Sequence, residues 1–239
     1  MRPFSEIIDR LRQYYGPPAA PPAHGPFELV LWENACYLLP DERRREVFET
    51  LRDKVGLNAA AIDAAADRVL LPIALRGGMH PEKRVFRWRE IARVTLDQYK
   101  GNLDSILTQP YAEAKKALKQ FPTIGDPGAE KILLLCGISG ALALESNGLR
   151  VLCRIGWGHE QKSYQGTYRS VQEALKPELP TEAGDLKQAH LLLRVHGKTL
   201  CNDKAPLCHQ CPVSGECAFA LAIGAAPPRP GKSLDQAPR

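Results

Sequence analysis

Apolar residues recur with a helical period along most of the chain. The clearest case is Phe4–Tyr15, where Ile7, Ile8 and Leu11 fall on one helical face together with Tyr14 or Tyr15. Segments with the period of two that is typical of strands are absent. The fold class is therefore expected to be all-α, with many short helices. The other helices are expected at about Phe27–Leu39, Asp41–Val55, Ala59–Val69, Pro81–Tyr99, Tyr111–Gln120, Asp126–Cys136, Asn147–Ile155, Ser163–Leu175 and Thr181–Gly197.

The segments between these helices, and the two ends of the chain, have distinct compositions. Residues 16–26, GPPAAPPAHGP, are expected to form a proline-rich connector, and residues 225–239 a disordered tail. The longest apolar runs, such as Ile132–Cys136, are too short to cross a bilayer. The first 15 residues are charged throughout and lack the apolar stretch of a secretory signal. We therefore expect a cytoplasmic or otherwise intracellular protein with no membrane partner, in a reducing compartment.

Composition narrows the function only slightly. The hydrophobic fraction of 44% and the charged fraction of 25% are ordinary for a globular protein. The net charge of +5 is compatible with a polyanionic partner, although many unrelated proteins are equally basic.

Four of the seven cysteines lie within residues 201–217, CNDKAPLCHQCPVSGEC. Their spacing is C-x6-C-x2-C-x5-C, at Cys201, Cys208, Cys211 and Cys217. In a reducing compartment, clustered thiolates favour zinc or an iron–sulfur cluster over disulfides. Zinc ribbons usually carry two CxxC pairs, whereas this segment has one. Zinc and four unrelated buried thiols remain as alternatives. The other three cysteines, Cys36, Cys136 and Cys153, lie in apolar helical contexts that favour the core.

Residues 121–129, FPTIGDPGA, join two expected helices through a turn that contains glycine. Asp126 suits the cap and Pro127 the first turn of the second helix. Such a turn exposes backbone N–H groups beside the positive end of a helix and can hold a phosphate. The residues expected to do so are Thr123, Ile124, Gly125 and Gly128. An ordinary helical hairpin with no ligand is the alternative.

The cysteine spacing, preceded by His196, Gly197 and Lys198, resembles the [4Fe-4S] loop of the endonuclease III family of helix-hairpin-helix DNA glycosylases. The FPTIG turn is similar to that family's hairpin, although Thr123 stands where the first glycine is usual. Residues 144–154, LESNGLRVLCR, are similar to its active-site segment and are closest to the adenine- and thymine-mismatch branches. Residues 26–41, PFELVLWENACYLLPD, resemble its first barrel helix.

The resemblance implies an architecture of two domains. A helical barrel domain is expected over residues 27–144, with the helix-hairpin-helix at about 118–136. An iron–sulfur cluster domain is expected from residues 1–26 and 145–224. Double-stranded DNA is the expected partner of a monomer, and a [4Fe-4S] cluster with a structural role is the expected cofactor.

The resemblance also implies the catalytic residues. Glu145 occupies the place of a carboxylate that is Asp in most members, and is expected to face the sugar in its ionised form. Asn147 is expected to orient Glu145 or a water molecule. Glu33 occupies a glutamate position of the adenine-mismatch branch. Its apolar sequence neighbours are expected to keep it protonated, so that it can donate to the leaving base. A helix-capping role for Glu145 and a surface or capping role for Glu33 are the alternatives.

Bifunctional members of the family use a lysine two residues after the last glycine of the hairpin, and this chain has Pro127 there. We therefore expect a monofunctional DNA glycosylase of base excision repair, a hydrolase with weak or absent lyase activity. The alternatives are a non-catalytic DNA-binding member of the same fold, a glycosylase/AP lyase that uses another lysine, for which Lys131 is nearest, and a zinc-stapled helical protein unrelated to repair.

Further DNA contacts are expected around the extruded base. In the stretch Arg76–His80, Met79 or His80 is expected to fill the gap in the stack, and Leu38 stands where many relatives insert a glutamine. Lys198 is expected to meet DNA beside the cysteine loop. The helix after His80 carries five basic residues, which either bind phosphates or form an ordinary solvated face. They are Lys83, Arg84, Arg87, Arg89 and Arg93.

Overall fold

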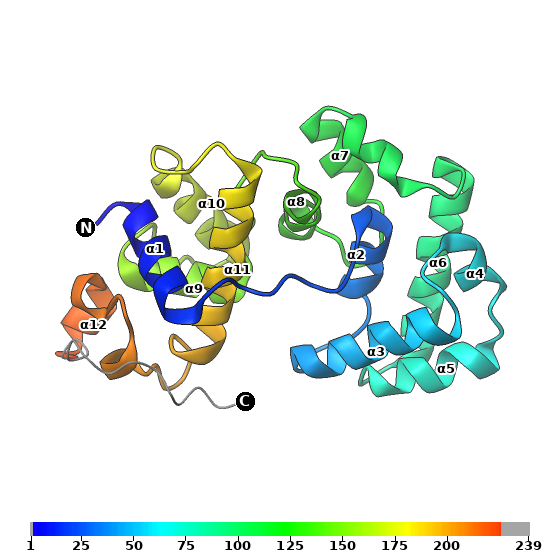
Figure 1. Ribbon diagram of the computed structural model, residues 1–239, viewed down its shortest axis with the longest axis horizontal. Helices are drawn as coiled ribbons and strands as arrows, with labels where there is room; N and C mark the ends of the chain where they lie inside the picture. The colour runs from blue at the N-terminus through cyan, green and yellow to red at the C-terminus, as the bar shows by residue number, and fades with distance from the viewer. Residues whose placement is uncertain (1, 226–239) are drawn as a thin grey trace. The chain divides into compact units, whose positions relative to one another are not determined.

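The structure is a computed structural model that describes residues 2–225 (Figure 1). The expectation of an all-α fold is confirmed, since every regular element among these residues is a helix. The expected disordered tail falls almost entirely on residues 226–239, outside the described part of the chain.

The chain divides into two compact units. One contains residues 20–143, and the other contains residues 2–19 together with residues 144–225 of the described chain. The first boundary falls before residue 20 rather than after residue 26. Ala23 accounts for part of this difference, because it packs against the core of the unit formed by residues 20–143.

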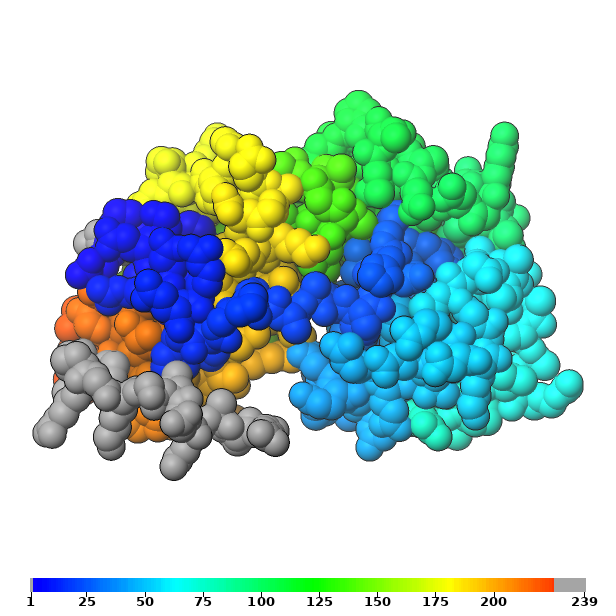
Figure 2. Space-filling model, in the orientation of Figure 1, coloured from blue at the N-terminus to red at the C-terminus, as the bar shows by residue number. Residues whose placement is uncertain are grey.

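The unit of residues 20–143 contains seven α-helices and one 3-10 helix. The long helix α6 lies at its centre, with Trp88 and Ile91 fully buried, and packs against α2, α4 and α5. In Figure 2, helix α3 lies on the visible face of this unit, in light blue. Burying side chains of this size stabilises the unit by roughly 1.5–3 kcal/mol each. The elements are α2 (Gly25–Glu33), α3 (Asp41–Lys54), α4 (Ala59–Ala64), α5 (Asp67–Arg76), α6 (Pro81–Tyr99), η1 (Leu103–Thr108), α7 (Tyr111–Leu118) and α8 (Asp126–Leu135).

Two helix predictions in this unit were wrong in extent. The helix expected over Ala59–Val69 is two helices, because Ala65 and Ala66 adopt extended backbone between α4 and α5. The first barrel helix ends at Glu33 rather than at Leu39. Asn34 caps the end of this helix. The backbone N–H of Asn34 donates to carbonyls of the last turn, and the side-chain amide of Asn34 donates to the carbonyl of Val30.

In the second unit, helix α11 packs against both α9 and α1 (Figure 1). The N-terminal helix has the predicted bounds, and Phe4 meets Trp157 edge to face at 5.7 Å between ring centroids. None of the described helices combines the length and apolar character that a membrane crossing needs. The elements are α1 (Phe4–Tyr15), α9 (Ser146–Ile155), α10 (Tyr164–Leu175), α11 (Ala183–Thr199), η2 (Cys208–Gln210), η3 (Ser214–Glu216) and α12 (Ala218–Ala222).

Candidate functional site

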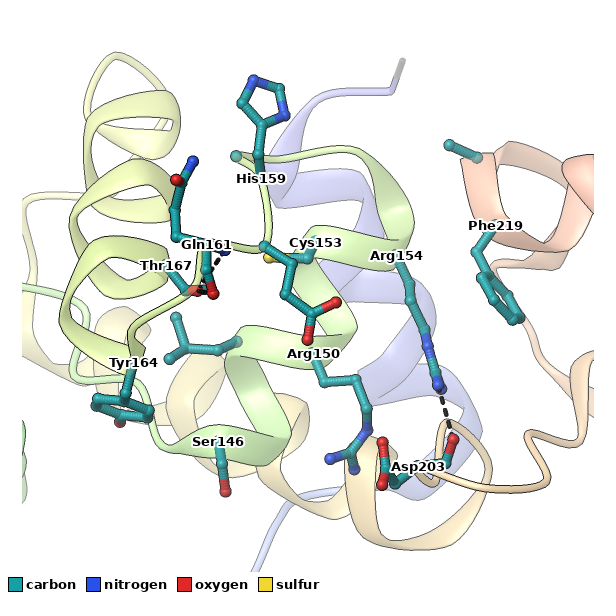
Figure 3. A pocket seen from close by; sticks show the side chains of 14 residues that line it. Ser146, Arg150, Cys153, Arg154, His159, Gln161, Tyr164, Thr167, Asp203 and Phe219 are labelled. Carbon is teal, nitrogen blue, oxygen red and sulfur yellow. Dashed lines mark hydrogen bonds between the residues drawn. The ribbon is translucent and has the colours of Figure 1, made fainter.

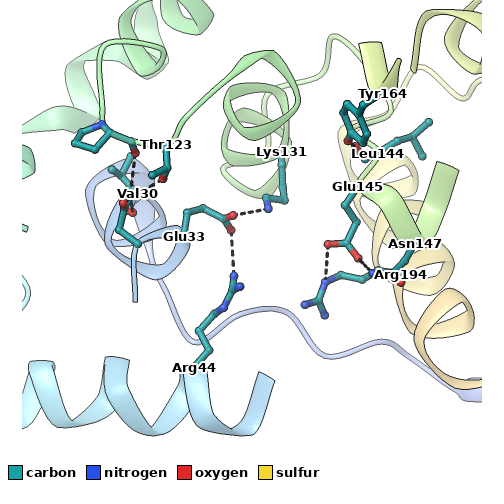
Figure 4. A network of polar contacts seen from close by, with 12 residues as sticks. Val30, Glu33, Arg44, Thr123, Lys131, Leu144, Glu145, Asn147, Tyr164 and Arg194 are labelled. Atoms are coloured by element: carbon teal, nitrogen blue, oxygen red, sulfur yellow. Dashed lines mark hydrogen bonds and ion pairs between the residues drawn. The ribbon is translucent and has the colours of Figure 1, made fainter. Parts of the chain in front are cut away.

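Glu145 lies at the N-terminus of α9, where both of its carboxylate oxygens are hydrogen-bonded (Figure 4). The side-chain amide of Asn147 donates to Oε1 at 2.8 Å, and Nε of Arg194 donates to Oε2 at 3.2 Å. The side chain makes no capping hydrogen bond to α9. Glu145 is thus held by an amide and a cation as an oriented, ionised carboxylate. Sequence reasoning missed Arg194, which lies 49 residues away on α11.

A series of hydrogen bonds links this carboxylate to the cysteine loop. The side-chain Oδ1 of Asn147 accepts from Nη2 of Arg150 at 2.9 Å, and Nε of Arg150 donates to the backbone carbonyl of Cys201 at 2.9 Å. Arg150 also donates to the carbonyl of Gly197 at 2.6 Å. A Cβ atom at Gly197 would lie 2.7 Å from the backbone carbonyl oxygen of Asn147, so only glycine permits this close approach. The position of the first cysteine and the orientation of Asn147 are therefore coupled.

Glu33 lies at the end of α2, in the unit of residues 20–143 (Figure 4). Its Oε2 accepts from Nζ of Lys131 on α8 at 2.6 Å, and its Oε1 lies 3.9 Å from Nη1 of Arg44 on α3. Two cations close to a carboxylate stabilise its ionised form. This environment is the opposite of the one that the apolar sequence neighbours suggested, because the partners come from other helices.

The turn between α7 and α8 keeps the geometry of a glycine turn in spite of Thr123. This residue has φ 64°, in the left-handed region that favours glycine. Its hydroxyl donates to the side-chain carbonyl of Asn34 at 3.1 Å, and the Asn34 amide donates to the carbonyl of Pro122 at 3.0 Å. The buried Asn34, which sequence reasoning did not single out, therefore fixes the turn against the end of α2.

The hairpin carries its own acidic group beside the turn. Lys119 donates to both oxygens of Asp126 at 3.0 Å, and Lys115 lies 3.2 Å from the same carboxylate. The hydrogen bond from Lys119, followed by the one from Lys115, lowers the pKa of Asp126. A bound phosphate would therefore compete with Asp126 for these two lysines.

The two loops proposed to act on the base stack lie against one another. The backbone N–H of Tyr37 donates to the carbonyl of Gly77 at 3.3 Å. Leu38 and Met79 are 79% and 61% exposed, and both Leu38 and His80 have positive φ. Exposed bulky side chains on left-handed backbone are unfavourable by about 1–3 kcal/mol each unless the surrounding structure imposes them. The loops thus present a preformed apolar projection.

Several arginines of the basic helix that follows contact neighbouring loops, which neither the phosphate-binding nor the solvated-face interpretation predicted. Arg84 is buried and donates to the carbonyls of four residues between Ala74 and Met79, which holds the preceding loop in place. Arg89 bonds the carbonyls of Asp63 and Ala65, and Arg93 bonds the Asp63 carboxylate. These arginines brace the α4–α5 and α5–α6 loops.

The four clustered cysteines line one small cavity of about 20 Å³. Burial raises the pKa of Cys208 and Cys217, and raises that of Cys211 to about 12. Buried thiols gathered at one cavity become thiolates only when a metal compensates their charge.

No three His, Cys, Asp or Glu side chains among residues 2–225 are arranged to hold a single metal ion. Thiolates around one zinc ion would converge at about 2.3 Å from it. Four cysteine sulfurs at one cavity are a donor set that both a [4Fe-4S] cluster and a zinc ion use.

A larger pocket of about 720 Å³ lies in the same unit beside the cysteine loop (Figure 3). Arg154 and Phe219 line both this pocket and the cysteine cavity. The guanidinium of Arg154 stacks on the Phe219 ring at 4.7 Å and donates to the carbonyls of Asn202 and Asp203. These two side chains therefore form a wall that the pocket and the cysteine cavity share.

Lys198, the expected DNA contact, is exposed near the end of α11.

Comparison with known proteins finds endonuclease III sequences. The chain is 30% identical to endonuclease III of Sulfolobus acidocaldarius over 99 residues, which are 41% of each chain. It is 24% identical to endonuclease III of Thermotoga maritima over 179 residues, covering 75% of this chain and 74% of that protein. The match to the Sulfolobus protein thus spans less than half of its length. No known family profile matches the chain.

Solved structures with the same fold extend over nearly the whole chain. A trapped covalent intermediate of endonuclease III with DNA superposes with a TM-score of 0.74 at 18% identity, covering 92% of this chain and 96% of that one. A thermostable thymine-DNA glycosylase superposes with a TM-score of 0.70 at 17% identity, covering 91% and 94% of the two chains. The fold is therefore shared although most residues differ.

Proposed function

We propose that the chain is a member of the endonuclease III-like helix-hairpin-helix DNA glycosylase family and a monofunctional DNA glycosylase of base excision repair. Its substrate is a damaged or mismatched base extruded from double-stranded DNA. The active-site segment favours a mismatch substrate of the adenine or thymine branches. The protein acts inside the cell as a monomer.

The carboxylate of Glu145 is the group that carries the reaction. Cleavage of an N-glycosidic bond develops positive charge on the sugar, and a fixed ionised carboxylate stabilises that charge. The observation that supports this role is the pair of hydrogen bonds from Asn147 and Arg194, which orient both oxygens. Asn147 and Arg150 act as positioning residues.

We assign Glu33 to contact with the departing base. Its ion pair with Lys131 argues against the protonated state that a direct proton donor requires. The same ion pair holds the Lys131 amine against a carboxylate instead of leaving it free to reach the sugar. With Pro127 at the usual lysine position, this supports weak or absent lyase activity.

The cofactor we propose is a [4Fe-4S] cluster held by Cys201, Cys208, Cys211 and Cys217. When bound, it supplies a rigid crosslink of the loop rather than hydrolytic chemistry. Through Arg150, the anchored loop restrains Asn147 and hence Glu145. The exposed Lys198 lies close in sequence to this loop and is assigned to a DNA phosphate.

DNA contacts in the other unit come from the hairpin and the projecting loops. The backbone around Thr123, Ile124, Gly125 and Gly128 is proposed to hold a phosphate. Met79 or His80, beside Leu38, is proposed to fill the space left by the extruded nucleotide.

The test is release of bases from a panel of lesion- and mismatch-containing duplexes. We expect release by the wild type, and a loss of about 10³-fold or more in Glu145→Gln, because the amide cannot stabilise the sugar cation. Glu173→Gln, an exposed position on α10, is the matched control and should retain activity. Release that persists in Glu145→Gln would contradict the assignment.

One observation favours a second candidate, a non-catalytic DNA-binding protein. Glu145 is one methylene longer than the usual Asp and is ion-paired to Arg194. Small displacements of a reacting group can cost orders of magnitude in rate. Tight duplex binding without release from any substrate of the panel would support this candidate.

A further inference from the structure

His196 is a buried polar residue that the reaction proposed above does not use. It lies on α11 with 1% of its surface exposed, and its ring meets Tyr15 of α1 edge to face at 5.9 Å between centroids. Its Nδ1 lies 2.9 Å from the Tyr15 hydroxyl, and its Nε2 lies 3.5 Å from Sγ of Cys211. Both ring nitrogens therefore have a partner, and one partner is a proposed cluster ligand.

The state of Cys211 decides which nitrogen carries the proton. A cysteine that ligates metal is a thiolate and can only accept a hydrogen bond. Nε2 must then be the donor to the sulfur. In a neutral imidazole Nδ1 is then the acceptor, and the Tyr15 hydroxyl must donate to it.

A third residue makes this arrangement possible. The Thr199 hydroxyl lies 2.8 Å from the Tyr15 oxygen and 3.0 Å from the Val195 carbonyl. When that single proton is donated to Tyr15 instead of to the Val195 carbonyl, the proton of Tyr15 is left for His196. The series then runs in one direction, from Thr199 through Tyr15 and His196 to the Cys211 sulfur.

We propose that His196, oriented by Tyr15, donates its Nε2–H to the Cys211 thiolate and thereby raises the reduction potential of the cluster. The proposal rests on the cluster assigned under the proposed function. Hydrogen bonds to ligand sulfurs are among the features that set cluster potentials. Such a donor stabilises the more negative, reduced state, so its removal lowers the potential. His196 and Tyr15 are positioning residues for the ligand and take no part in base release.

The experiment measures the cluster reduction potential by voltammetry of the full-length protein, together with iron and sulfide content. His196→Phe removes the donor and keeps an aromatic ring, so its potential should fall. His196→Gln keeps an N–H donor and should restore most of the wild-type value. Tyr15→Phe removes the group that orients the ring and should lower the potential by a smaller amount. Tyr37→Phe makes the same chemical change at an exposed tyrosine of the other unit and should leave the potential unchanged.

Each outcome decides the proposal. Lower potentials in His196→Phe and Tyr15→Phe at full iron content, with recovery in His196→Gln, support it. If His196→Phe does not fold, the comparison of Tyr15→Phe with Tyr37→Phe decides in its place. The proposal is overturned if wild type and Tyr15→Phe have equal potentials, or if Tyr15→Phe loses iron. Either result would mean that Tyr15 and His196 only pack against one another. Wild-type protein purified anaerobically without iron would overturn both the proposal and the cluster itself.

Discussion

Glu145 and Glu33 are both carboxylates at helix ends, yet they are held in different ways. Glu145 accepts hydrogen bonds from the neutral amide of Asn147 and from Arg194. Asn147 is in turn hydrogen-bonded to Arg150, which contacts the cysteine loop. Glu33 bonds a lysine at 2.6 Å and has a second cation at 3.9 Å. Local sequence suggested that Glu33 is the protonated residue of the pair, but two cations stabilise its charged form. The charge state of each carboxylate is therefore decided by partners distant in sequence.

The largest expected difference between the two carboxylates is in base release. Glu145→Gln should lose about 10³-fold or more in single-turnover rate, whereas Glu33→Gln should lose about 10- to 100-fold. The reason is that only Glu145 is assigned to the charge on the sugar. Equal losses in the two variants would remove the distinction drawn between them.

The next largest difference is expected when a partner of one or the other carboxylate is removed and base release is measured. Asn147→Ala removes the amide donor to Glu145 and one link to Arg150, so we expect a loss of about 10- to 100-fold in base release. Arg44→Ala removes a cation that lies 3.9 Å from Glu33, beyond hydrogen-bond distance, and should change the rate by less than about 3-fold. The measurement is the single-turnover rate on the substrate that the lesion panel identifies, with circular dichroism as a control for folding.

A smaller effect is expected for the lysine that pairs with Glu33. Lys131→Gln should change base release by less than about 10-fold, which corresponds to roughly 1.4 kcal/mol. Neither the wild type nor this variant should form a covalent adduct with an abasic product in borohydride. A strong adduct in the wild type that Lys131→Gln abolishes would make Lys131 a nucleophile and the protein a lyase.

The smallest effect concerns pH and the hairpin. The pKa of Asp126 is lowered by its hydrogen bonds to Lys119 and Lys115. A carboxylate with a depressed folded-state pKa stabilises the fold above its ordinary range near pH 4, and this contribution is lost as pH falls through the depressed value. Asp126→Asn should therefore flatten the pH dependence of the urea midpoint below about pH 4. It should also strengthen DNA binding slightly, because Lys119 loses its contact with the Asp126 carboxylate, while Lys115 stays paired with Glu130. An unchanged acid profile would contradict this.

Most of the fold could be predicted from the sequence, with errors at particular places. The Phe4–Tyr15 helix has a regular apolar face and was predicted with its observed bounds. The error at Ala59–Val69 arose because alanine fits a helix well, while Ala65 and Ala66 adopt extended backbone there. The error at Leu39 arose because the end of α2 is set by Asn34, whose second partner lies 88 residues away.

The chain by itself determined the chemistry that is available. Three local patterns carry this chemistry: the spacing of four cysteines, the FPTIG turn and the LESN segment. Each can be recognised from residues that are close together in the sequence. Only the tertiary structure decided how those groups are held. It paired Glu33 with Lys131, buried Arg84 among carbonyls, brought Arg194 to Glu145 and joined Tyr15 to His196. These partners lie between 5 and 181 residues apart, and no helical period or motif relates them. Hydrogen bonds and charges act over a few ångströms of space, so their partners appear only once the helices have packed.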